Sequence, residues 1–172
     1  MATKELTKTN GLATKATLRN HLNLDTKKMT TLSKELNGLL SDYHMFYQNL
    51  RGFHWNVKGG DFFDLHEKFE ELYDNVNEHI DVLAERIVTI GFNPLHTFED
   101  FLKISIHKSH RDVSIGDECL KHVLNDLGIL ISTHRDLAGN AATAEDIVTA
   151  DMLTKFATEL EKKLWMFTQF SK

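Results

Sequence analysis

The feature that most constrains this chain is the near absence of proline, because Pro94 is the one proline among 172 residues. Proline removes a backbone hydrogen-bond donor and kinks or ends a helix, so its scarcity allows long helices. Along four extended segments the apolar residues recur at gaps of three and four, which is the spacing of an amphipathic helix. No segment shows sustained alternation with period two. The sequence therefore predicts an all-α fold.

Glycine, asparagine and proline divide this pattern into four long helices and one short one. The long helices are expected over about 29–57, over about 62–90, from Val113 to a break at Gly139-Asn140, and from Ile147 to Phe167. Phe98, Phe101, Leu102 and Ile104 indicate a short helix within 95–111. Four long helices with a short one in the middle crossover form a four-helix bundle. We expect one bundle domain over 29–170, preceded by a flexible arm over 1–28.

Composition narrows the classes of protein that remain possible. With 41% hydrophobic and 26% charged residues, the chain is in the globular range. Its one cysteine, Cys119, excludes an intrachain disulfide and a cysteine-based metal site, and is expected to be buried. No apolar run approaches the ~18 residues of a membrane span, and the N-terminal segment has no apolar core of a secretory signal. A cytoplasmic protein is expected.

The charge is unevenly distributed along the chain. The formal net charge is −5, yet residues 1–28 carry +4 and the remaining residues carry −9. The basic residues of the arm are Lys4, Lys8, Lys15, Arg19, Lys27 and Lys28. A basic arm on an acidic body is typical of proteins that touch polyanions such as DNA through a tail. The alternative is a solubilising terminus that binds nothing.

Two pairs of possible metal ligands lie on the expected helix 62–90. His66 and Glu70 are four residues apart, as are Asp81 and Glu85, so each pair shares one helix face. His54 lies across the glycine turn from His66, and a hairpin would bring them together. Histidine with carboxylates suits iron, manganese or zinc. The alternative is an ordinary solvated face with a structural or surface histidine.

The distance between these pairs predicts a site shared by two chains. Their midpoints are fifteen residues apart, which is roughly 22 Å along a helix with a net rotation of about 60°. Ligand atoms lie only about 2.0–2.2 Å from a metal ion, so one chain cannot close both pairs around one ion. In a two-fold dimer whose antiparallel helices cross near residue 75 or 76, the first pair of one chain faces the second pair of the other.

Three segments of the sequence resemble the Dps family of mini-ferritins. These are HWNVKG at 54–59, FFDLHEKF at 62–69 and IDVLAERI at 80–87, and the segments at 149–153 and 161–166 resemble the last helix of that family. The resemblance covers about residues 29–170. It implies a ferritin-like bundle, a hollow homo-dodecamer, oxidation of Fe(II) with hydrogen peroxide, storage of Fe(III) oxide and, for several members, DNA binding without sequence specificity.

The resemblance also assigns residues to the ferroxidase centre. His54, His66 and Glu70 would bind iron from one chain, and Asp81 and Glu85 from its neighbour. Glu70 departs from the family pattern, which usually has aspartate there, so the carboxylate reaches one methylene further. The chain has no Glu-x-x-His motif, which argues against an ordinary ferritin or bacterioferritin.

The resemblance suggests roles for a few further residues, each with an alternative. Trp55 would supply or intercept an electron, or would simply be packed. Acidic residues near the start of the last helix would line an iron pore, or would pair with the helix dipole; they are Glu145, Asp146 and Asp151. Among the other histidines, His44 and His134 are expected to be buried and structural. His107 and His110 are expected in an exposed loop, where a surface metal is the alternative.

Three functions remain open at this point. The first is a peroxide-consuming ferroxidase and iron store that protects DNA from oxidative damage. The second is a non-specific DNA-binding and nucleoid-compacting protein with incidental metal binding. The third is a structural helical shell that a host reads as a surface antigen.

Overall fold

The computed structural model describes residues 22–171, most of which lie in five α-helices. In chain order these are α1 (Thr26–Asn56), α2 (Phe62–Thr89), α3 (Phe98–Ile104), α4 (Gly116–Thr143) and α5 (Ile147–Phe170). The all-α prediction is confirmed, and the short helix lies in the connection where it is expected.

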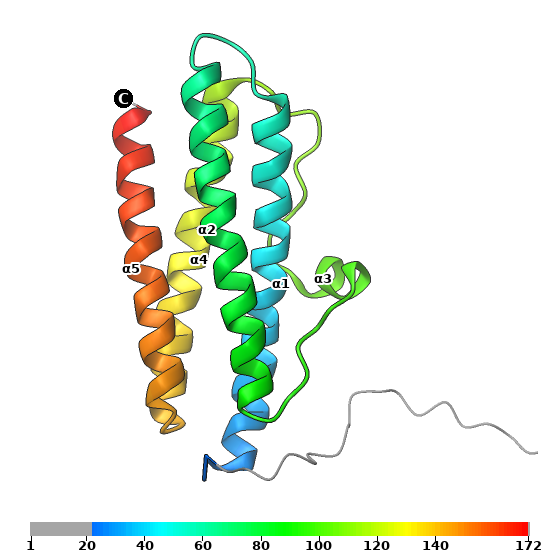
Figure 1. Ribbon diagram of the computed structural model, residues 1–172, viewed down its shortest axis with the longest axis vertical. Coiled ribbons are helices and arrows are strands. Elements are labelled where there is room, and N and C mark those ends of the chain that lie inside the picture. Colours follow the sequence, from blue (N-terminus) through cyan, green and yellow to red (C-terminus); the bar gives the residue numbers. More distant parts are fainter. Residues whose placement is uncertain (1–21, 172) are drawn as a thin grey trace, which may run out of the picture.

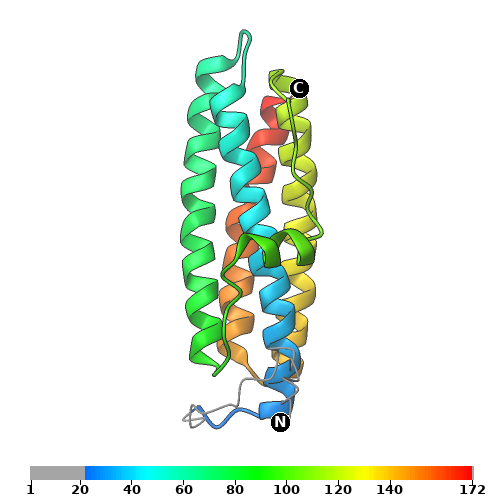
Figure 2. The same ribbon diagram turned by 90° about the vertical axis from the view of Figure 1, so that its right-hand side faces the viewer.

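The four long helices run side by side, with α1 beside α2 and α4 beside α5 (Figure 1). The connection from α2 to α4 returns from one end of the bundle to the other, and α3 crosses the outer face of α1 on the way (Figure 2). One long crossover within an otherwise antiparallel bundle is the connectivity of ferritin-like folds.

Each long helix buries the apolar stripe that its sequence predicts. Leu36, Phe46, Leu72 and Leu127 are fully buried, and Cys119 is buried as expected. Burying a side chain of this size stabilises a fold by about 1.5–3 kcal/mol. The interior is therefore continuous between the helices, and the polar side chains that enter it need partners.

A hydrogen-bonded network supplies those partners near the middle of the bundle. His134 Nδ1 donates to the Leu130 carbonyl at 2.6 Å, so its Nε2 accepts from the Tyr43 hydroxyl at 2.9 Å. The Tyr43 oxygen in turn lies 3.0 Å from His79 Nδ1, and His79 Nε2 lies 3.0 Å from a Glu159 oxygen. The buried structural role expected for His134 is confirmed.

One helix boundary was predicted wrongly. Gly139-Asn140 does not end the third long helix, which continues to Thr143. Glycine inside a helix costs only about 1 kcal/mol relative to alanine, and that cost is too small to override the packing of α4 on its neighbours. The helix ends where Glu145 takes a left-handed φ of 66° and its N–H returns to the Ala142 carbonyl, which is a role that glycine usually fills.

The other boundaries follow their signals within a few residues. α1 begins at Thr26, slightly before the expected start, because the Asp25 side chain caps it by accepting the Lys28 N–H at 2.8 Å. α2 ends just before Gly91, whose φ is 93°. Asp61 stands at the N-cap position of α2, but its side chain makes no capping hydrogen bond.

The structure bears in part on the expected basic arm and on membrane spans. Lys4, Lys8, Lys15 and Arg19 lie outside the described residues, whereas Lys27 and Lys28 belong to the first turn of α1. Within residues 22–171, every helix is too short or too polar to cross a membrane.

Candidate metal centre

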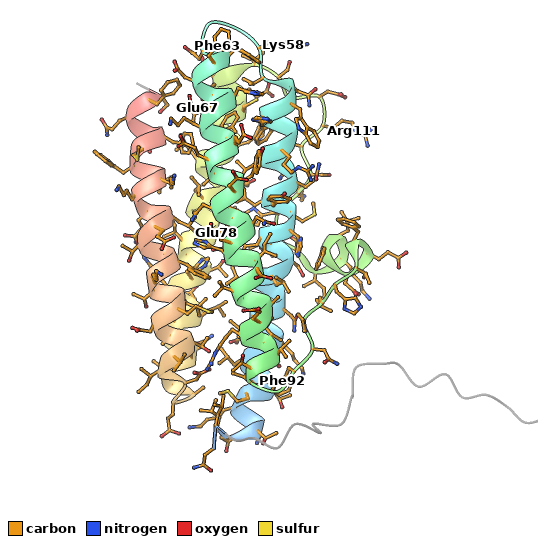
Figure 3. The ribbon with its side chains drawn as sticks, viewed as in Figure 1. Lys58, Phe63, Glu67, Glu78, Phe92 and Arg111 are labelled. Carbon is orange, nitrogen blue, oxygen red and sulfur yellow. The ribbon has the colours of Figure 1, made fainter. Side chains whose placement is uncertain are left out.

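The turn between α1 and α2 brings two of the predicted ligands together. It includes Gly59, whose φ of 113° lies in the region that favours glycine. The Lys58 N–H donates to the Ser114 carbonyl at 2.8 Å, which ties the turn to the segment before α4. Figure 3 shows Lys58 at this end of the bundle, together with Phe63 at the start of α2. His54 near the end of α1 and His66 near the start of α2 face each other there, as the hairpin predicts.

Two reciprocal hydrogen bonds fix both imidazoles. His54 Nδ1 donates to the backbone carbonyl of His66 at 2.7 Å, and His66 Nδ1 donates to the carbonyl of His54 at 2.8 Å. Because a carbonyl oxygen only accepts, each Nδ1 carries the hydrogen, and each neutral ring then has its lone pair on Nε2. The rings stack with their centroids 3.7 Å apart. The sequence thus builds two imidazoles that are already in the tautomer a metal ion requires.

Glu70 lies one turn after His66 and completes a group of three donors. One donor atom from each of His54, His66 and Glu70 lies within 4.8 Å of the other two. Among residues 22–171, no other group of three His, Cys, Asp or Glu residues meets this spacing. His54 is buried and Glu70 is exposed. The group therefore opens from the protein interior onto the surface of α2.

Tyr73 supports this group, although no role at the site was predicted for it from the sequence. Its hydroxyl donates to Glu70 Oε1 at 3.1 Å, and its ring meets the His54 ring edge-on at 5.4 Å. Desolvation and, next, the hydrogen bond to Glu70 raise the pKa of Tyr73, so the phenol remains a donor at neutral pH. The available signal was the i,i+3 spacing, which places both side chains on one helix face.

The second predicted pair, Asp81 and Glu85, is exposed and lies farther along the same helix. α2 is continuous over its whole length, so the roughly 22 Å between the two pairs is not shortened by a break. In Figure 3, Glu67 lies near the start of α2 and Glu78 near its middle, and the second pair follows Glu78 in the chain. Within one chain the structure does not bring Asp81 and Glu85 to His54 and the other two donors.

Trp55 is not part of the core of the chain, because 56% of its surface is exposed. The Arg51 guanidinium lies 4.7 Å above its ring, and such a contact contributes about 0.5–1 kcal/mol at an exposed site. Trp55 is therefore packed against Arg51 at the surface of the chain and not in its core.

The three acidic residues near the start of α5 have different surroundings. Asp146 is buried, and its side chain caps α5 by accepting the Thr149 N–H at 3.1 Å. Glu145 is exposed and lies 2.7 Å from the Lys28 ammonium, and Asp151 is also exposed. For Asp146 the structure supports the helix-terminus alternative over a place in a pore.

The histidines of the α3–α4 connection are not the exposed loop residues that the sequence favoured. His107 is only 4% exposed and His110 is half-buried. Both lie against Asp126 of α4. His44 is half-buried and stacks on Phe101 of α3 with centroids 3.9 Å apart. Long-range packing of the connection on the bundle, which has no periodic signal, decides these positions.

The sequence of the chain matches known proteins over most of its length. The family described as the ferritin-like domain matches residues 33–172. The DNA protection during starvation protein of Porphyromonas gingivalis is 37% identical over 148 residues, which are 86% of this chain and 93% of the relative. A protein of Haemophilus influenzae described as uncharacterized is 42% identical over 146 residues, covering 85% of this chain and 91% of the relative.

Solved structures agree with this similarity. The DPS protein of Vibrio cholerae O1, described as a member of a superfamily of ferritin-like diiron-carboxylate proteins, superposes with a TM-score of 0.87 at 38% identity and covers 89% of this chain and 96% of its own. The Dps protein of Bacillus brevis gives a TM-score of 0.83 at 36% identity, covering 87% of this chain and 100% of its own.

Proposed function

This chain belongs to the Dps family of ferritin-like proteins, and on that premise we propose that it is a ferroxidase that oxidises Fe(II) with hydrogen peroxide and stores the ferric product. The observation that carries the proposal is the group His54, His66 and Glu70, whose donor atoms lie within 4.8 Å of one another. The diiron-carboxylate description of the V. cholerae protein supports it, since imidazole and carboxylate are the donor types that iron uses.

Each proposed iron site takes its remaining donors from a second copy of the chain. Asp81 and Glu85 of the partner subunit face His66 and Glu70 when two α2 helices cross antiparallel near residue 75 or 76. The length of the unbroken α2 supports this arrangement, because it keeps the two halves of the ligand set roughly 22 Å apart within one chain. Two-fold symmetry then gives two equivalent sites per dimer.

The donor set favours oxidation of the bound iron. Carboxylates prefer the harder Fe(III) ion over Fe(II), and a site with few protein ligands leaves positions open for peroxide. Two Fe(II) ions supply the two electrons that cleave the O–O bond of one peroxide. With two water molecules taken up, the products are two FeO(OH) units and four protons. Peroxide and free Fe(II) are removed together, so hydroxyl radicals do not form.

Storage requires a shell, and we propose the homo-dodecamer that the family resemblance implies. Several large apolar side chains are exposed on the single chain, among them Ile147 (74%), Val148 (63%) and Trp165 (60%). Exposed apolar surface of this kind marks places where protein partners are buried, and further copies of the chain would cover it.

Protection of DNA is the second part of the proposal. The P. gingivalis relative is named for DNA protection during starvation, and removal of iron and peroxide would protect DNA chemically without contact. Direct binding is an alternative function, and it would use Lys4, Lys8, Lys15 and Arg19, since the rest of the chain is acidic. Twelve such arms on one particle would add avidity to weak single contacts.

A complementation experiment tests the shared ferroxidase centre. One variant carries His54→Ala and His66→Ala, and the other carries Asp81→Asn and Glu85→Gln. Each variant alone should lose peroxide-driven Fe(II) oxidation. When the two are unfolded together and reassembled, half of the random dimers are mixed and each mixed dimer regains one of its two sites, so about a quarter of the wild-type rate should return.

Two outcomes would contradict the proposal. A wild-type rate in either variant alone would exclude the substituted residues as ligands. No recovery on mixing, with mixed particles verified by native mass spectrometry, would place the centre within one chain. Glu67→Gln with Glu78→Gln is a matched control, because these exposed acids of α2 lie outside the proposed ligand set.

A further inference from the structure

A second cluster of metal-ligating side chains lies where the α3–α4 connection packs on α4, and the proposed ferroxidase does not use it. His107 and His110 come from the connection, and His122 and Asp126 come from α4. His122 and Asp126 are four residues apart and share a helix face. The ring centroids of His110 and His122 lie 3.9 Å apart, and His107 and His110 both contact Asp126, so the four side chains form one cluster.

Asp126 is at the centre of the cluster. Its Oδ1 lies 3.2 Å from His107 Nδ1, and its Oδ2 lies 3.6 Å from His110 Nε2. The side chain of His107 is 0% exposed and that of Asp126 is 5% exposed. A carboxylate is thus held inside the protein with an imidazole against each of its two oxygens.

Several polar atoms of this cluster are buried without a hydrogen bond. They are both ring nitrogens of His107, Nε2 of His110 and Oδ2 of Asp126. The contact of His107 with Asp126, at 3.2 Å, lacks the direction of a hydrogen bond, and that of His110, at 3.6 Å, is too long for one. A buried polar atom left unpaired costs about 1–3 kcal/mol, so a concentration of such atoms at one place points to a ligand that satisfies them.

Two distances in the cluster are near those of a metal site, although no three donor atoms from different residues of the cluster lie within 4.8 Å of one another. Donor atoms bound tetrahedrally at about 2.1 Å from a zinc ion are themselves roughly 3.4 Å apart. Asp126 Oδ1 lies 3.2 Å from His107 Nδ1 and Asp126 Oδ2 lies 3.6 Å from His110 Nε2, so each separation is near that value but at a different carboxylate oxygen. The donor atoms of this cluster are farther apart than those of the His54 group. Metal binding would therefore rotate the His110 and His122 side chains so that their rings turn toward Asp126.

The backbone of the histidine segment is held in place by α1. Asn49 donates to the Lys108 carbonyl at 2.9 Å and accepts the His110 N–H at 3.1 Å. Asp42 accepts the Ile106 N–H at 2.8 Å. These bonds fix the segment on both sides of His107 without using the imidazoles, so the rings are positioned while their nitrogens stay available.

The cluster has an apolar wall and a route to the surface. The ring centroids of Phe46 and His107 lie 6.3 Å apart, and those of Phe53 and His110 lie 5.7 Å apart. His110 and Phe53 also line a surface pocket of about 300 Å³ beside Lys58. Of the four cluster residues, His110 is the one that lines this pocket, so it connects the cluster to the surface.

We propose that His107, His110, His122 and Asp126 form a binding site within one chain for a four-coordinate divalent cation of the zinc class. Three imidazoles and one carboxylate are borderline donors of the kind that Zn(II) takes. Four protein ligands leave no open position, as in structural rather than catalytic zinc sites. The bound ion ties the α3–α4 connection to α4 and stabilises the chain.

The test measures Zn(II) binding in assembled protein that carries His54→Ala and His66→Ala, so that the ferroxidase ligands do not contribute. Isothermal titration calorimetry should show one Zn(II) per chain, and zinc should raise the midpoint of thermal unfolding. Co(II) in place of zinc should give the intense visible absorption of a four-coordinate ion. Adding His107→Ala and His110→Ala should abolish the bound zinc, the thermal shift and the Co(II) spectrum.

Controls separate loss of the site from loss of the fold. His96→Ala removes an exposed histidine of the α2–α3 connection and should leave zinc binding unchanged. Should the double histidine variant fail to fold, Asp126→Asn, which keeps the side-chain size, should abolish zinc binding instead. In the otherwise wild-type chain, His107→Ala with His110→Ala should retain Fe(II) oxidation. Absence of zinc binding in the starting variant, or zinc binding that survives the loss of His107 and His110, would overturn the proposal.

Discussion

Arg86 of α2 and Asp146 at the start of α5 form a buried ion pair, with Arg86 Nη2 2.6 Å from Asp146 Oδ1. Arg86 Nε also donates to the Thr149 hydroxyl at 2.7 Å. The end of α2 and the start of α5, which carry the pair, lie at the end of the bundle opposite the α1–α2 turn (Figure 1). It joins two helices that are distant in sequence, and it holds the part of α2 that carries Glu85.

Replacing Arg86 with methionine should therefore destabilise the chain strongly. The variant leaves the buried Asp146 carboxylate with its Thr149 hydrogen bonds but without its charged partner, and breaking one side of a buried pair costs about 3–5 kcal/mol. Urea unfolding followed by circular dichroism measures the difference. Lys28→Met breaks the exposed pair with Glu145 instead, so it serves as the control and should produce no measurable loss. Equal effects of the two substitutions would contradict the role assigned to Arg86.

Replacing Tyr73 with phenylalanine should weaken metal binding without removing a ligand. The hydroxyl orients the Glu70 carboxylate, and loss of such an outer partner lowers metal affinity by roughly 10–100-fold. The affinity for Zn(II), used as a redox-inactive probe in a chain with His107→Ala and His110→Ala, measures the effect. Tyr47→Phe is the matched control, because the Tyr47 ring contacts Tyr73 but is not a partner of Glu70. An unchanged affinity in the Tyr73 variant would remove the hydroxyl from the site.

The rate of Fe(II) oxidation should depend more on the charge of the residue 70 side chain than on its length. Glu70→Gln removes a negative charge that favours Fe(III), and we expect peroxide-driven oxidation of Fe(II) to fall by roughly tenfold or more. Glu70→Asp restores the residue usual in the family and keeps the charge, so it should retain most of the rate. Stopped-flow absorbance of the ferric product compares the variants. A glutamine variant as fast as the aspartate variant would show that the carboxylate is not a ligand.

The stability of the chain should fall as the pH is lowered from about 6.5 towards about 4. Burial lowers the pKa of His134 to about 4, whereas an unfolded histidine titrates near 6.5. Between these values the unfolded state binds the additional proton, so His134 contributes a loss of roughly 3 kcal/mol across the window. In His134→Gln the unfolding free energy, although lower overall, should depend less steeply on pH. Equal slopes in both proteins would contradict the assignment.

Removal of residues 2–21 should decide whether the basic arm binds DNA. This deletion takes away Lys4, Lys8, Lys15 and Arg19 but leaves Asp25, which caps α1. The full chain should retard DNA in a gel at low salt and lose the effect as salt rises, since phosphate contacts release counterions. The deleted chain should not retard DNA at any salt concentration. Unchanged retardation would exclude the arm, and failure of the full chain to bind at low salt would exclude direct DNA association.

Much of the fold could be read from local patterns. The gaps of three and four between apolar residues predicted the long helices, because a helix that packs on one side must bury one stripe. The left-handed position at Gly91 likewise ended α2 where expected. The break predicted at Gly139 failed because a single helix-weakening residue costs less than the packing of α4 contributes.

The sequence by itself determined which donors exist and how far apart they lie along α2, since helical geometry converts residue numbers directly into distances. It also placed His54 opposite His66, because one glycine turn separates them. Only the tertiary structure decided the tautomers of those two rings, the support of Glu70 by Tyr73, and the burial of His107 against Asp126. These depend on side chains that meet across different elements, and neither periodicity nor spacing within one helix encodes such a meeting.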